Sequence, residues 1–83
     1  MQISIEFYAS LMKYLPPGNS RFRREVRIDD GLLLDGLIEQ FPIPPQMAHI
    51  VLVNGRFVDA EVRGEHVLVE GDVVSIWPPV AGG

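Results

Sequence analysis

The chain contains no cysteine and only two histidines among its 83 residues. Without cysteine it can form no disulfide, thiol nucleophile or thiolate metal site. His49 and His66 are not at a metal-ligand spacing from each other or from a carboxylate cluster, so we interpret both as structural or surface residues. No glycine-rich phosphate loop precedes a helix, and no serine stands in a nucleophile-elbow pattern. We therefore expect no bound metal or cofactor and no catalysis by side chains.

Basic residues are also scarce, and the formal net charge is -4 with a sequence pI near 4.9. An acidic chain is poorly suited to neutralising phosphates, which argues against nucleic acid as the main partner. No apolar run approaches the roughly 20 residues needed to cross a bilayer, and the first residues lack a positively charged stretch followed by an apolar one. We expect a cytoplasmic protein without a membrane partner.

One local exception is the cluster of Arg21, Arg23, Arg24 and Arg27. Its ordinary interpretation is the solvated face of a strand. A docking patch for an acidic partner is the alternative. The sequence does not decide between the two roles.

The first half of the chain predicts two strands and a helix. Apolar and polar residues alternate over residues 2–8, which puts Ile3, Ile5 and Phe7 on one face and Ser4, Glu6 and Tyr8 on the other. A short helical turn is expected over Ser10–Leu15. Residues 22–28 form a second strand, with Phe22, Val26 and Ile28 on its buried face. Asp29-Asp30 then starts a helix whose apolar stripe is Leu33, Leu34, Leu37, Ile38 and Phe41, and Pro42, Pro44 and Pro45 end it.

The second half predicts strands alone. His49–Val53 is predicted to be a strand that runs into Asn54-Gly55, the strongest short signal for a hairpin. Arg56–Val58 is predicted to form the second strand of this hairpin. A short strand over His66–Val69, a turn at 70–72 and a last strand over Asp72–Trp77 follow. One amphipathic helix among several strands predicts an α+β domain, with the helix on one face of a mixed sheet. The β-grasp is the candidate fold, over residues 1–77.

The last six residues, Pro78-Pro79-Val80-Ala81-Gly82-Gly83, are expected to form a flexible segment outside that domain. Two prolines favour an extended backbone, and six residues reach roughly 20 Å. Gly82 and Gly83 lack a Cβ and can thread a narrow channel. A terminal carboxylate on Gly83 becomes reactive only after conversion to an acyl-adenylate. The ATP, magnesium and catalytic groups for that step would come from a partner enzyme.

The run from Gly71-Asp72 through Trp77 to Pro78-Pro79-Val80-Ala81-Gly82-Gly83 strongly resembles the MoaD/ThiS family of ubiquitin-like sulfur carriers. Within that family it is most similar to the small subunits of molybdopterin synthase. The start, residues 3–9, resembles the family's first strand, and Leu52-Val53-Asn54-Gly55 resembles its hairpin. The resemblance covers essentially the whole chain.

The resemblance implies a β-grasp fold with the first and last strands as parallel neighbours. It implies that a ubiquitin-activating-type (MoeB/ThiF-like) adenylyltransferase adenylates Gly83, and that a sulfur donor protein supplies the sulfur of a thiocarboxylate there. The segment 78–82 would then thread into the active site of a MoaE-like large subunit, where sulfur passes to a pterin precursor in molybdenum cofactor biosynthesis. By position, Tyr8, Phe57 and Trp77 match an apolar partner-binding patch beside this segment.

Two segments depart from the family pattern: Pro16-Pro17-Gly18 with the arginine cluster, and the proline-rich residues 42–46. They leave the sulfur acceptor open, with thiazole, an amino acid or tRNA as alternatives to the pterin. A protein modifier conjugated through Gly83 is a further alternative of a different class. In each case the chain itself is expected to be a non-catalytic carrier.

Overall fold

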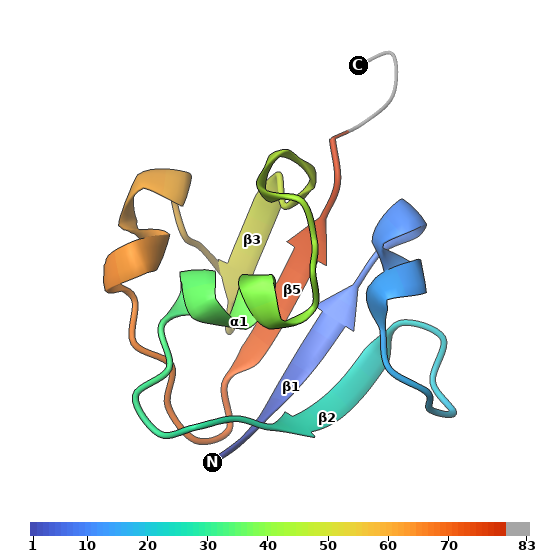
Figure 1. Cartoon of the computed structure of the whole chain (residues 1–83), viewed down its shortest axis with the longest axis horizontal. Coiled ribbons are helices and arrows are strands. Elements are labelled where there is room, and N and C mark those ends of the chain that lie inside the picture. The colour runs from blue at the N-terminus through green and yellow to red at the C-terminus, as the bar shows by residue number, and fades with distance from the viewer. Residues whose placement is uncertain (80–83) are drawn as a thin grey trace.

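The structure, a computed structural model, describes residues 1–79 (Figure 1). A five-stranded sheet with the order β2-β1-β5-β3-β4 forms one layer. Its strands are β1 (Gln2–Phe7), β2 (Arg23–Arg27), β3 (Ile50–Val53), β4 (Arg56–Phe57) and β5 (Val73–Trp77). A single α-helix, α1 (Leu34–Gln40), covers one face. Three short 3-10 helices, η1 (Ala9–Tyr14), η2 (Pro45–Met47) and η3 (Ala60–Glu65), connect the elements.

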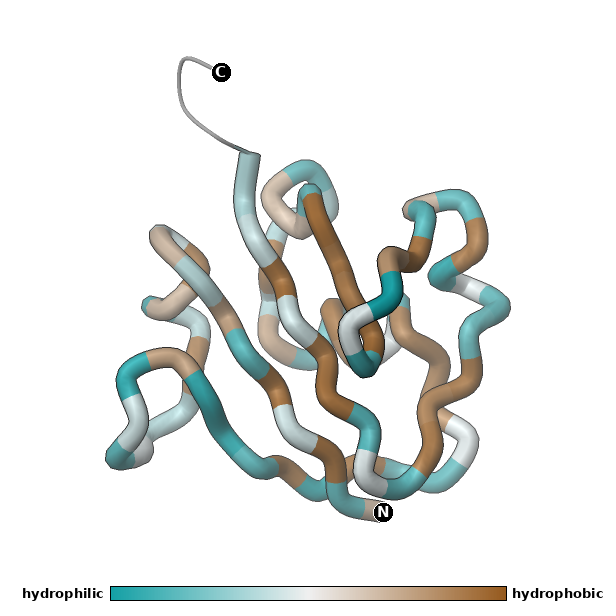
Figure 2. The backbone as a smooth tube through the Cα atoms, turned by 180° about the vertical axis from the view of Figure 1, so that it is seen from behind, coloured by the Kyte–Doolittle hydropathy of each residue, from teal (hydrophilic) through white to brown (hydrophobic). Residues whose placement is uncertain are grey.

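The two central strands, β1 and β5, run parallel, with Ile5 opposite Val74 and Phe7 opposite Ile76. These four side chains are completely buried, as the alternation in the sequence predicts. Leu34 and Leu37 of α1 share the core with them. The arrangement is the β-grasp, so the predicted fold class is confirmed. Seen from behind in Figure 2, hydrophobic and hydrophilic residues alternate along the central strands.

Within residues 1–79, no helix covers the opposite face of the sheet, which we call the open face (Figure 1). Ser4 and Glu6 of β1 and Ser75 of β5 point to this side because they alternate with the buried residues. The predicted hairpin joins β3 to β4, and Asn54 and Gly55 have φ values of 53° and 81°. Positive φ at both positions is the requirement of the type I′ two-residue turn. The predicted helical turn near residue 10 is η1.

The predicted start of the helix at Asp29-Asp30 is wrong, because α1 begins at Leu34. Leu33 has extended backbone angles and pairs with Val67 in an isolated bridge, which delays the helix. Its side chain is 38% exposed, so it does not belong to the core stripe. Asp30 instead accepts a hydrogen bond from the amino group of Met1.

The predicted strand over His66–Val69 is also wrong, since among the described residues it is reduced to one isolated bridge, with Val67 opposite Leu33. The flanking N–H groups of Leu34 and Leu68 donate to the carbonyls of His66 and Leu32, at 2.9 Å each. Leu33 belongs to no strand, so no ladder can form beside it. Phe22 precedes the first residue of β2, and it is 39% exposed, whereas Val26 is half-buried and Ile28 is buried. Strand alternation therefore does not set the direction of its side chain.

Candidate functional site

Three aromatic rings stack at one end of the sheet. The ring of Tyr8, just after β1, lies 4.4 Å from that of Trp77 at the end of β5, with only 5° between the ring planes. Phe22 stacks on Tyr8 at 5.3 Å. Because β1 and β5 are parallel neighbours, their carboxyl ends lie at the same edge of the sheet. The pairing thus brings together two of the three predicted partner-binding residues.

The third, Phe57, lies on β4, separated from β5 by β3. It is opposite Leu52, which is opposite Ser75, so Phe57 also faces the open side of the sheet. Its side chain is 57% exposed. Phe57 is therefore on the predicted face but outside the aromatic stack.

Residues that the sequence analysis missed fill the space between Phe57 and the stack. Ile50 is opposite Trp77 on β3 and is 37% exposed, and Leu52 follows it on the same face. Their alternation with the buried Val51 and Val53 was the available signal. We call this band the apolar face. It consists of Tyr8, Phe22, Ile50, Leu52, Phe57 and Trp77.

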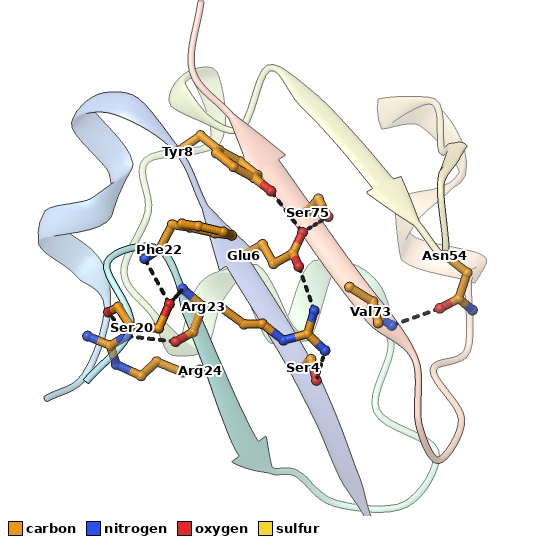
Figure 3. Close-up of polar contacts among 10 residues, drawn as sticks. All are labelled: Ser4, Glu6, Tyr8, Ser20, Phe22, Arg23, Arg24, Asn54, Val73 and Ser75. Carbon is orange, nitrogen blue, oxygen red and sulfur yellow. Dashed lines mark hydrogen bonds and ion pairs between the residues drawn. The ribbon is translucent and has the colours of Figure 1, made fainter. Parts of the chain in front are cut away.

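A polar network beside the stack is centred on Glu6 (Figure 3). Oε1 of Glu6 accepts hydrogen bonds from the Tyr8 and Ser75 hydroxyls, both at 2.9 Å. Oε2 accepts one from Arg23 at 2.7 Å, and the same guanidinium donates to the Ser4 hydroxyl at 3.0 Å. The network therefore connects β2, β1 and β5 across the open face.

This network keeps Glu6 charged and Tyr8 protonated. Burial alone would raise the pKa of Glu6, but the hydrogen bonds from Tyr8, Ser75 and Arg23 outweigh it and lower the pKa below the ordinary 4.5. Burial and the carboxylate of Glu6 raise the pKa of Tyr8. At neutral pH the phenol is therefore a hydrogen-bond donor to a carboxylate, and this bond orients the ring in the stack.

Pro78 and Pro79 follow β5 directly (Figure 1), at the end of the sheet where the rings of Tyr8 and Trp77 stack. Pro78 is buried and Pro79 is exposed. The backbone N–H of His49 donates to the carbonyl of Trp77 at 3.0 Å and holds the strand until its last residue. A mainly apolar groove surrounds this exit, lined by Ala9, Ser10, His49, Ile50, Trp77, Pro78 and Pro79.

The remaining predicted site residues are Val80, Ala81, Gly82 and Gly83. They lie outside the described residues. Within residues 1–79, no group of three or more histidine, cysteine or acidic side chains is arranged to hold a metal ion. None of the helices in this part of the chain has the length and apolar character needed to cross a membrane.

Arg63 is a buried charge that no local sequence pattern singles out. Its side chain, in η3, is only 6% exposed. The guanidinium donates to the carbonyl of Ala48 at 2.8 Å and to that of His49 at 3.4 Å. Burial lowers the pKa of Arg63, while Asp35 and Asp59 oppose this shift. Arg63 thereby positions the residues that enter β3 and border the exit groove.

Comparison with known proteins agrees with this geometry. The ThiS family model matches residues 5–83. SAMP1 from Haloferax volcanii superposes with a TM-score of 0.65 at 22% identity, over 100% of both chains. A Pyrococcus furiosus protein named as subunit 1 of a molybdopterin converting factor superposes with a TM-score of 0.65 at 20% identity. The match covers 95% of this chain and 98% of that one.

A third similar structure is a complex of subunits 1 and 2 of the molybdopterin-converting factor from Helicobacter pylori. One chain of that structure superposes on this protein with a TM-score of 0.60 at 19% identity, and the match covers 100% of this chain and 100% of that one. No curated protein matches the sequence. The structural matches establish the β-grasp fold, and the family model covers nearly the whole chain. The chain belongs to the ThiS family of small ubiquitin-like sulfur carriers.

Proposed function

We propose that this protein carries sulfur on the terminal carboxylate of Gly83 and donates it in molybdopterin synthesis. The observation that carries the proposal is the position of Pro78 and Pro79, which follow Trp77 at the end of β5 and at one end of the apolar face. A partner docked on this face would meet the segment in a defined direction. The protein would then act as the non-catalytic small subunit of a heteromeric synthase.

The described residues make that docking surface rigid. Trp77 is held by its stack on Tyr8, and Tyr8 by its hydrogen bond to Glu6. Buried aromatic side chains at an interface commonly contribute most to binding. Pre-organised rings lose little conformational entropy on association, which increases affinity. The apolar face therefore has the properties of a binding surface for a protein subunit.

The chemistry requires two partners in turn. A carboxylate oxygen of Gly83 would attack the α-phosphate of ATP and release pyrophosphate, with ATP and Mg²⁺ bound by a ubiquitin-activating-type (MoeB/ThiF-like) adenylyltransferase. The outer sulfur of a donor protein's persulfide would then attack the acyl carbon and displace AMP, which gives an acyl disulfide with the donor. A thiol would attack the donor's own sulfur in that disulfide, so that the S–S bond breaks, the donor leaves as a mixed disulfide and the thiocarboxylate remains on Gly83. A MoaE-like large subunit would accept the loaded protein, as the Helicobacter pylori complex of two subunits suggests.

The test is the intact mass of the protein after incubation with ATP, a sulfur donor and soluble extract of its host. A variant lacking Gly83 is the control, because it removes the residue proposed to carry sulfur and leaves the described residues 1–79 unchanged. The expected result is a gain equal to replacing one oxygen by sulfur, absent from the control. No gain, in an extract shown to load a known carrier, would refute the carrier role.

Two further readouts separate the alternatives. Release of the added sulfur on incubation with a MoaE-like subunit and its pterin precursor would support molybdopterin over other acceptors. Higher-mass protein adducts that depend on Gly83 would instead support a protein modifier. The same Gly83-deleted protein is the control in both experiments.

A further inference from the structure

The basic residues of this acidic protein are concentrated on one edge of the sheet. Residues 21–27 hold four of the seven lysines and arginines but only one of the eleven acidic residues. They include the whole of β2, which is the last strand on its side of the sheet. Arg21 and Arg27 are exposed, and neither forms a salt bridge with another described residue. The proposed carrier function uses Phe22 and Arg23 of this segment, through the apolar face and the Glu6 network, but not the outer side of β2 beyond them.

The register of β2 shows which of its backbone groups face outward. The N–H of Ile28 donates to Met1 and that of Phe7 to Phe22, so even-numbered residues of this strand pair with β1. Glu25 and Arg27 therefore direct their N–H and C=O groups away from the sheet. No hydrogen bond to these outward groups occurs within residues 1–79.

At the other half of β2, the outward backbone groups of Arg23 already have hydrogen-bond partners within the chain. The N–H of Arg23 donates to the Ser20 hydroxyl, and the carbonyl of Arg23 accepts from the Arg24 guanidinium at 2.7 Å. The Arg24 side chain also donates to the carbonyl of Pro16 and packs against Gly18. The contacts of Ser20 and Arg24 thus close the edge at Arg23 (Figure 3). The outward groups of Glu25 and Arg27 remain open within residues 1–79.

The charge pattern of β2 rejects a second copy of the same strand. If two copies paired antiparallel about Glu25, that residue would meet its own copy and Arg23 would meet Arg27. Like charges placed directly opposite each other destabilise a strand pair. Charged edge strands commonly prevent self-association in this way. The same pattern favours a strand in which the charges are reversed.

We propose that the open half of the β2 edge binds an extended segment of a partner protein that adds a strand to the sheet. In an antiparallel pair, this segment would place an acidic residue opposite Arg27 and, two residues later, a basic residue opposite Glu25. An apolar residue between them would lie beside the half-buried Val26. Glu25 and Arg27 would supply four backbone hydrogen bonds, and the side chains would select the partner.

The test uses the full-length protein and two short peptides, each blocked at both ends. One contains Thr-Glu-Val-Lys-Thr and the other Thr-Lys-Val-Glu-Thr, so composition and net charge are identical. Titration to millimolar peptide is followed by backbone NMR. We expect the first peptide to bind about tenfold more tightly, because two cross-strand pairs change from opposite to like charge. Slower amide exchange at Glu25 and Arg27 should accompany binding.

A charge-inverted protein, Glu25→Arg with Arg27→Glu, provides the decisive control. Both positions are exposed, so folding should be unaffected, and the preference should switch to the second peptide. Equal binding of the two peptides, or no protection of these two amides, would overturn the proposal. The charges would then serve only to prevent self-pairing. Neither outcome depends on the chemistry of Gly83, so this test is independent of the carrier function.

Discussion

Replacing Glu6 by glutamine tests whether the polar network supports the open face. Glutamine keeps the size of the side chain but removes the charge that accepts three hydrogen bonds. The Glu6 side chain is only 16% exposed, so water replaces these bonds poorly. The change weakens the connection between β2, β1 and β5 without creating a cavity in the core.

Hydrogen bonds to a charged group contribute about 1.5–3 kcal/mol each, but the glutamine oxygen can still accept some of them. We therefore expect a loss of about 2 kcal/mol in the free energy of unfolding at pH 7, which lowers the Tm by about 10 °C. The pKa of Glu6 is lowered in the folded state, so its contribution is present above the unfolded pKa. The contribution disappears as pH falls through the folded pKa.

Urea denaturation at pH 7 and at a series of pH values below 4.5 measures both effects. The matched control is Glu65→Gln, because Glu65 is exposed and accepts no hydrogen bond within the described part of the chain. The stability difference between wild type and Glu6→Gln should shrink steadily in acid. A loss no larger than that of the control, or one that is independent of pH, would refute the reasoning.

Two other predictions concern partner binding and the core. Trp77→Ala and Phe57→Ala should each weaken binding to the activating enzyme or the synthase large subunit at least about tenfold. Phe57→Ala should cost less than about 1 kcal/mol in stability, because its ring is 57% exposed. Unchanged affinity with a large fall in Tm would identify these rings as core residues. Arg63→Met should reduce the free energy of unfolding by about 2–4 kcal/mol, because the buried carbonyl of Ala48 and the part-buried carbonyl of His49 lose their donor. Urea denaturation equal to wild type would contradict this role.

The regular parts of the fold were predictable because local patterns determine them. Alternation over residues 2–8 identified β1 and showed that Tyr8 lies off the core face. Asn54-Gly55 identified the hairpin because few residue pairs accept positive φ at both positions. The spacing of Leu34, Leu37 and Ile38 identified α1, and all three side chains are buried.

The errors arose where distant segments decide local structure. Leu33 begins no helix because Val67 pairs with it, and no local pattern indicates that bridge. Phe22 follows the apolar pattern of β2 but stacks on Tyr8 instead. Burial of Arg63 depends on the carbonyls of Ala48 and His49, which its own sequence context does not reveal.

The sequence by itself determined the class of the protein: one small α+β domain, without cysteine, whose last strand leads into Pro-Pro-Val-Ala-Gly-Gly. Tertiary structure decided which side chains meet. Glu6 and Ser75 are separated by 69 residues, yet they share a hydrogen bond. Parallel pairing of β1 with β5 also places Tyr8 against Trp77, where the C-terminal segment begins. Such contacts depend on strand order and register, which arise from burying one common core rather than from any local sequence pattern.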